Sequence, residues 1–350
     1  SNHKSLWAKN KKNFLIGSWC LLQKNKFEKK KRKYLIQKYH WDNQLKLKKD
    51  IKYLYKVYNF ILKRLKNILN NYHNTNFSTR YYKILMSKWL WRFILFHYDR
   101  WEIVNDLKKS KKKLSCKVFL YDKKYFVPTD TFDYCTSMIF SNDWNHWVFS
   151  EIISYQKAVK EIKINDKNII PKIKKDKIRK TTFKSLSNKF LSTPSSNDLF
   201  AQNMAFSRKA KLVFNSYYKQ FRFVYPEKSN LISSSSNINI KDRIALTNKN
   251  KSKNKFINFL FYQLPYNLPK IFFENYKINV NNLKKLSFPK NPKKIMTAYD
   301  HHFNDLFNLY VAKNVDNRSK YYIFQHGGSY GVSDNHTPEY LDIDVSDKFF

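Results

Sequence analysis

The segment most suited to chemistry is Gln325-His326-Gly327-Gly328, followed closely by Gly331. The chain of 350 residues contains only four glycines, and three of them fall in this short segment, directly after a predicted strand. Glycine tolerates positive φ and lets the backbone approach a ligand, so successive amides can face a phosphate or a sugar hydroxyl. The clustering therefore indicates a ligand-binding turn.

His326 is predicted to lie at the carboxyl end of that strand, where open α/β sheets bind their ligands. A histidine there can act as a base toward an acceptor hydroxyl or as a donor toward a leaving phosphate. We take His326 as the catalytic candidate, with Gln325, Tyr330 and the three glycines as substrate-binding candidates. The alternative is a tight turn in which His326 is a satisfied, half-buried residue.

Downstream of the turn, acidic residues cluster in a chain where they are scarce. Glu339, Asp342, Asp344 and Asp347 all fall within the last residues of the sequence. One of them could orient His326 or contact substrate, and Glu339 is included among the substrate-binding candidates. Most of the four acidic side chains are expected to lie on a solvent-exposed face.

Asp300, His301 and His302 could begin a metal site, but adjacent histidines on a strand-to-helix turn are expected to point apart. The sequence places no further ligand beside them. We therefore predict helix capping for this segment and no metal site. No cofactor is predicted either.

Polar residues between aromatic ones form a further set of candidates. His40 and Asp42 precede a long predicted helix, where Asp42 is a plausible N-cap. Asp99 and Arg100 form either an internal ion pair or part of a sugar pocket. Arg80, Asp99 and Arg100 are second-choice pocket residues.

The elements that must position these residues alternate between strand and helix, which indicates an α/β fold. Apolar spacing predicts one helix from Asp42 to about residue 72, a second after Ser78, and a third over Thr131–Ser154. Strands are predicted around Phe14–Ile16 and Cys116–Tyr121. Near the end, strand Lys294–Ala298, helix His302–Lys313 and strand Tyr321–Gln325 suit a βαβ unit.

Composition divides the chain into three parts. Residues 1–156 are predicted to form an α/β core with long helices. Residues 157–255 are rich in lysine, serine and asparagine and are predicted to be surface insertions and loops. Residues 256–350 contain the βαβ unit and end in the glycine turn.

The strongly basic net charge suggests an alternative to an enzyme with a catalytic histidine, namely a protein that binds nucleic acid. Lys and Arg total 68 against 26 Asp and Glu, a net charge of +42. Such a balance suits an anionic membrane surface or nucleic acid, so an RNA-binding or organellar ribosomal protein is the competing hypothesis. The glycine cluster does not favour it.

The absence of a Walker loop, a GxSxG elbow, a kinase signature and an HExxH motif disfavours several large enzyme classes.

Location is predicted from the apolar runs and the cysteines. The most apolar stretch, Ile84–Tyr98, is interrupted by charges and is too short to span a bilayer. No signal peptide is recognisable at the start. The three cysteines are widely spaced, which argues against a disulfide framework. We expect a cytoplasmic protein, with possible peripheral contact to the inner face of the plasma membrane.

Several short segments, taken in order, resemble a family of transferases of bacterial surface-polysaccharide biosynthesis that is related in layout to GT-B glycosyltransferases. The matching segments are Phe14–Cys20, Tyr39–Asp42, Ser78–Tyr81, Asp99–Trp101, Asp143–His146 and Gln325–Gly331.

This resemblance implies transfer of a sugar or sugar phosphate from a nucleotide-activated donor to a polysaccharide or lipid-linked acceptor. It also implies that a carboxyl-terminal, donor-binding domain is missing here, and that the fragment alone could be inactive. The first, Rossmann-like domain of such enzymes chiefly binds the acceptor, with His326 as the base at the cleft edge.

Overall fold

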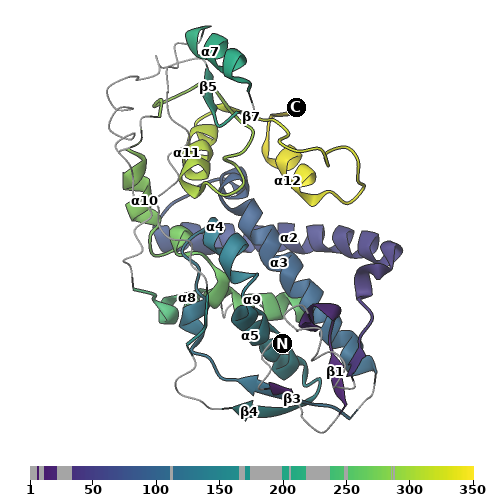
Figure 1. The fold of residues 1–350 in the computed structure, drawn as a ribbon. Coiled ribbons are helices and arrows are strands. Elements are labelled where there is room, and N and C mark those ends of the chain that lie inside the picture. Colours follow the sequence, from purple (N-terminus) through teal and green to yellow (C-terminus); the bar gives the residue numbers. More distant parts are fainter. Residues whose placement is uncertain are drawn as a thin grey trace.

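The computed structural model describes residues 6–7, 12–21, 34–110, 113–164, 170–173, 199–204, 206–217, 237–247, 251–284, 286 and 288–350. It is a mixed α/β fold in which every sheet of the described residues is parallel. Figure 1 shows a parallel sheet at one end, two long helices across the middle, and further helices with two small sheets at the other end. The predicted fold class, α/β, is confirmed at this level.

The two long helices, α2 (Gln44–His73) and α3 (Thr79–Lys109), form the centre of the core. Their buried faces repeat at helical spacing, as the sequence predicted. Ser78 caps α3 by accepting a hydrogen bond from the amide of Tyr81. The predicted cap of α2 is wrong by one residue: Asn43 accepts from the amide of Lys46, while Asp42 lies in the preceding helical turn η3 (His40–Asp42) and is exposed.

The predicted βαβ unit is confirmed. Strand β6 (Lys294–Thr297), helix α11 (Asp305–Asp316) and strand β7 (Lys320–Ile323) follow one another, and β6 pairs in parallel with β7. Strands β5 (Leu199–Gln202) and β8 (Lys348–Phe349) complete a sheet of order β5-β6-β7-β8. Helix α11 packs against α3, and α12 (Thr337–Val345) lies beside β7 and β8 (Figure 1).

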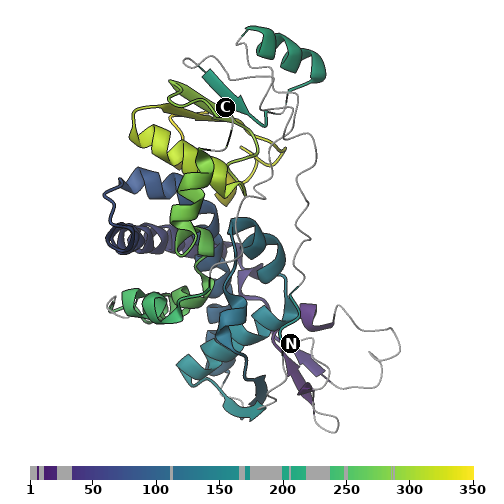
Figure 2. The same cartoon turned by 90° about the vertical axis from the view of Figure 1, so that its left-hand side faces the viewer.

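The other end of the molecule holds two two-stranded sheets. In one, β1 (Asn13–Leu15) pairs with β2 (Tyr34–Ile36), and in the other β3 (Ser115–Phe119) pairs with β4 (Lys160–Ile164). Gly17 follows β1, where an added Cβ would collide with the ring of Trp19. Figure 2 shows these sheets far from the four-stranded sheet, with α2 and α3 between them.

The helix predicted over Thr131–Ser154 is wrong as a single element. The chain forms a short helix α4 (Thr131–Asp133), a π-helical turn η5 (Tyr134–Met138) and helix α5 (Asn142–Gln156). The break has a local cause, because the side chain of Ser141 accepts a hydrogen bond from the amide of Trp144 and starts a new helix there.

Several further helical elements are present, of which α9 packs against α3, α8 against α9, and α10 against α11. They are η2 (Ser18–Leu21), η4 (Lys123–Phe126), α7 (Arg208–Tyr217), α8 (Ile240–Thr247), α9 (Lys255–Asn267), η6 (Lys270–Phe272) and α10 (Tyr276–Leu283). Much of the predicted insertion region, residues 157–255, lies outside the described residues, so that division of the chain stays a prediction. Its described parts include β4 and β5, each paired with a strand from outside the region.

The identity of the α2 cap can be checked by unfolding. We expect Asn43→Ala to lower the free energy of unfolding by about 0.5–2 kcal/mol, because one helix-end amide loses its partner. Asp42→Ala is the matched control and should change stability by less than about 0.5 kcal/mol. Urea denaturation of both variants measures this, and a larger loss for Asp42→Ala would contradict the assignment.

Candidate functional site

The candidate site lies at the carboxyl ends of the neighbouring parallel strands β6 and β7. His301 and His302 follow β6, and His326 follows β7. Helix α12 closes one side of this edge and α3 lies beneath it. Parallel strands deliver their carboxyl ends to one edge, so residues distant in sequence meet there.

Asp342 of α12 is the polar centre of the site. Its side chain is fully buried, and its Oδ1 forms an ion pair with Lys88 Nζ of α3, which is also buried. The same Oδ1 lies 3.2 Å from His301 Nε2. Its Oδ2 accepts a 3.0 Å hydrogen bond from the hydroxyl of Tyr330. One carboxylate thus joins α3, α12 and both loops of the site.

Tyr330 connects this carboxylate to His326. The Tyr330 hydroxyl lies 3.1 Å from His326 Nδ1, and His302 Nε2 also lies 3.1 Å from that nitrogen. Because the single hydroxyl proton of Tyr330 goes to Asp342, its oxygen is an acceptor toward His326. A proton on His326 Nδ1 satisfies this contact and requires His302 Nε2 to be the unprotonated, accepting nitrogen. In this tautomer His326 Nε2 has a free lone pair, the form of a base.

Burial and charge keep these groups in the required protonation states. Burial lowers the pKa of His326, so its imidazole is neutral at neutral pH. Burial lowers the pKa of His301 to about 4 and also lowers that of His302. Burial and the nearby Asp342 raise the pKa of Tyr330, which keeps its proton. Burial alone would raise the pKa of Asp342, but the charge of Lys88 and the contact with His301 hold it below its usual value.

The glycine turn is open around Gly327 and Gly328. A Cβ added at Gly327 or Gly328 would have no atom within 4 Å. Among the described residues, the amides of these two glycines have no hydrogen-bond acceptor. Gly331 alone of the glycines has positive φ, at 71°, and its amide donates to Glu339 Oε2 over 2.8 Å. Gln325 is exposed, and its amide donates to the carbonyl of Phe350.

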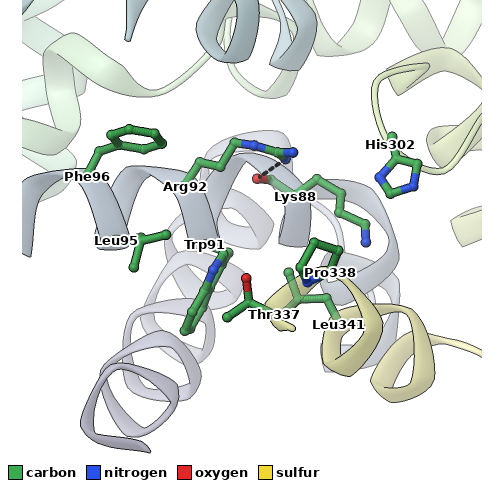
Figure 3. Close-up of a pocket in the computed structure, with 9 residues that line it drawn as sticks. All are labelled: Lys88, Trp91, Arg92, Leu95, Phe96, His302, Thr337, Pro338 and Leu341. Carbon is green, nitrogen blue, oxygen red and sulfur yellow. Dashed lines mark hydrogen bonds between the residues drawn. The ribbon is translucent and has the colours of Figure 1, made fainter. Parts of the chain in front are cut away.

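A cavity of about 100 Å³ lies between α3 and α12 beside His302 (Figure 3). Its lining residues are Lys88, Trp91, Arg92, Leu95, Phe96, His302, Thr337, Pro338 and Leu341. In Figure 3 the Lys88 ammonium points toward His302, and Arg92 lies along α3 with a hydrogen bond to the carbonyl of Lys88. The space suits several waters or one small group rather than a whole sugar.

The expected solvated face is wrong for Asp342, which is fully buried, whereas Asp344 is exposed and Glu339 and Asp347 are half-buried. Asp342 pairs with Lys88, Asp344 with Lys83 and Asp347 with Arg80, all between α3 and the chain end. Arg80 therefore anchors the end of α12 instead of lining the cavity. Glu339 lies beside Gly331 and His336.

His40, Asp99 and Arg100 meet in a separate cluster. Asp99 accepts hydrogen bonds from the hydroxyl of Tyr39, from His40 Nε2 and from Arg100 Nη1. The guanidinium of Arg100 also donates to Asn145 Oδ1. Asp99 lies 11 residues after Lys88 on α3, about 16 Å along the helix axis. Asp99 and Arg100 thus form an internal ion pair, and the structure does not bring them to His326.

The expectation for Asp300, His301 and His302 is wrong in two respects. The rings of His301 and His302 do not point apart, since their centroids are 3.9 Å apart, and His326 joins them. Capping of α11 comes from Asn304, which accepts from the amide of Phe307. Asp300 instead accepts from the side chain of Asn203.

Sequence reasoning missed Lys88 and did not single out Asp342 among its acidic neighbours. One signal was available for Lys88. It is a charged residue within the most apolar stretch of the chain, where a lysine is buried only with a partner.

Comparison with protein families completes the description. The whole chain, residues 1–350, matches the model of the LIC12162 family of transferases, and the chain belongs to this family. No curated protein and no solved structure matches it. The prediction of a transferase is confirmed at this level, and the RNA-binding alternative gains no support. Among the described residues, no helix is long and apolar enough to cross a membrane.

The buried ion pair yields a stability prediction. We expect Asp342→Ala to lower the free energy of unfolding by about 3–5 kcal/mol, because Lys88 is left buried without a counter-charge. The double variant Lys88→Met/Asp342→Leu should recover most of this loss. Thermal or urea unfolding measures both.

The matched control is Asp344→Ala, which breaks the partly exposed pair with Lys83 on the same two helices. It should cost no more than about 1 kcal/mol. Equal losses for Asp342→Ala and Asp344→Ala would contradict the central role of Asp342.

Proposed function

We propose that this chain carries the acceptor-activating site of a glycosyltransferase-like enzyme. The enzyme transfers a sugar or sugar phosphate from a nucleotide-activated donor to a hydroxyl of a polysaccharide or lipid-linked acceptor. The observation that carries the proposal is the chain of contacts Asp342–Tyr330–His326, which leaves His326 Nε2 as a base at an open glycine turn.

The proposed step is proton abstraction coupled to transfer. His326 Nε2 takes the proton of the acceptor hydroxyl while that oxygen forms a bond to the transferred group. The bond between this group and the nucleotide phosphate breaks, and the electron pair leaves with the phosphate. The amides of Gly327 and Gly328 are suited to donate to the developing negative charge. Tyr330 and Asp342 hold the imidazole in the tautomer that this step needs.

The wider layout is part of the same proposal. The parallel sheet with helices, and a ligand edge at the carboxyl ends of its strands, suits the acceptor-binding domain of a GT-B enzyme. In that layout a second, donor-binding domain faces His326. The net charge of +42 would favour contact with an anionic membrane surface that presents a lipid-linked acceptor.

Replacing the base tests the chemistry. We expect His326→Gln in the full-length protein to lower kcat about 100- to 10,000-fold, the usual loss when a general base is removed. Nucleotide release from a panel of nucleotide sugars, with and without lipid-linked acceptors, is the measurement.

Val332→Ser, an exposed position in the same loop, is the matched control and should retain activity. Full transfer by His326→Gln on a donor that the parent protein uses would remove His326 from the mechanism.

The pH dependence has a defined direction. Since burial lowers the pKa of His326 from its ordinary value of 6.5, the neutral base persists below that pH. We expect kcat/KM to stay level from neutral pH down past 6.5 and to fall only at more acidic pH, as Nε2 is protonated. A fall of kcat/KM on the acidic side with its midpoint above pH 6.5 would contradict the lowered pKa of His326.

A further inference from the structure

Three imidazoles converge at the edge of the sheet, and the proposed base catalysis gives a role to only one of them, His326. One ring nitrogen from each of His301, His302 and His326 lies within 4.8 Å of the other two. His302 Nε2 and His326 Nδ1 are separated by 3.1 Å. Neighbouring nitrogens of a tetrahedral site with metal–nitrogen bonds of about 2.0–2.1 Å are roughly 3.3 Å apart. His302 and His326 already have nearly this spacing.

A second observation points to a missing ligand. His301 is only 3% exposed, and neither of its ring nitrogens makes a hydrogen bond of good geometry among the described residues. An unpaired buried polar atom costs about 1–3 kcal/mol. Nε2 has at least a charged neighbour, since it lies 3.2 Å from Asp342 Oδ1. A carboxylate on one imidazole nitrogen, with the second nitrogen free, is the usual outer shell of a metal-binding histidine.

The chemistry of the three groups selects the class of metal. Each of the three rings offers one nitrogen whose lone pair, in the neutral imidazole, ligates a cation. The charges that face them from α3 and α12 are Lys88 and Asp342, which neutralise each other, and His336 faces His326. Three imidazoles without a carboxylate suit Zn²⁺ and related transition metals rather than Mg²⁺ or Ca²⁺.

We propose that His301, His302 and His326 form a three-nitrogen site for a divalent transition metal, with Zn²⁺ the preferred ion. The fourth position opens toward solvent beside His326, which is only half-buried, so a water or an oxygen of a substrate can complete the coordination.

Metal binding and base catalysis compete for the same ring. With Nδ1 of His326 on the metal, the ring proton moves to Nε2, which can then no longer accept a proton from an acceptor. The metal-loaded protein is therefore expected to be inactive in transfer. This consequence rests on the proposed function, whereas metal binding itself does not.

Direct titration tests the site. Purified protein treated with a chelator and dialysed is titrated with Co²⁺, followed by the visible absorption of a four-coordinate ion, and then with Zn²⁺ in competition. We expect stoichiometric binding of Co²⁺ and its displacement by Zn²⁺. Zn²⁺ should also raise the melting temperature, because it binds only the folded protein.

The half-exposed His326 is the safest position to change. His326→Gln, and independently His302→Gln, should weaken binding by at least about 100-fold, the upper end of the loss seen for outer-shell partners. His73→Gln, at a histidine that contacts the carbonyl of Phe272 outside the site, is the matched control and should bind as the parent does.

Absence of Co²⁺ and Zn²⁺ binding to the parent protein would overturn the proposal, as would equal binding by His326→Gln. Neither result would affect the proposed base, because the effect of His326→Gln on transfer can be measured with a chelator present throughout. A chain that binds Zn²⁺ but shows no loss of transfer in His326→Gln would retain the metal site and refute the base.

Discussion

Lys88 of α3 and Asp342 of α12 form an ion pair in the interior of the protein. Both side chains are nearly or completely buried. Neither charge is tolerable there without the other, since an isolated buried ion is strongly penalised. The ion pair therefore fixes the position of α12 against α3. The remaining contacts of Asp342, with His301 and Tyr330, then fix both loops of the site.

Helix α3 extends this arrangement along its length. Arg80, Lys83 and Lys88 successively pair with Asp347, Asp344 and Asp342, so one helix carries the cations and the chain end carries the anions. Only the last of these pairs is deeply buried. The two partly exposed pairs help to align α12 with α3 but add little stability. The buried pair makes any shift of α12 along α3 costly, because such a shift would separate two buried charges.

The sequence predicted those features that depend on neighbouring residues. The βαβ unit, the helix starting after Ser78 and the position of His326 at a strand end all followed from local periodicity and from the scarcity of glycine. The break at Ser141 was overlooked because aromatic residues continue through it. What could not be predicted was the meeting of Lys88 and Asp342, which are 254 residues apart, or the approach of His302 to His326. Such contacts depend on how α12 packs against α3 and the sheet, and no local sequence pattern predicts that packing.

The several partners of Asp342 also limit how this part of the chain can change over evolutionary time. A single carboxylate serves a lysine, a histidine and a tyrosine that come from three separate segments. A substitution at one of these positions removes a contact that the others require, so its effect depends on which residues already occupy them. Substitutions within this group are therefore expected to be strongly non-additive, so that a change at one position is better tolerated when a partner changes with it.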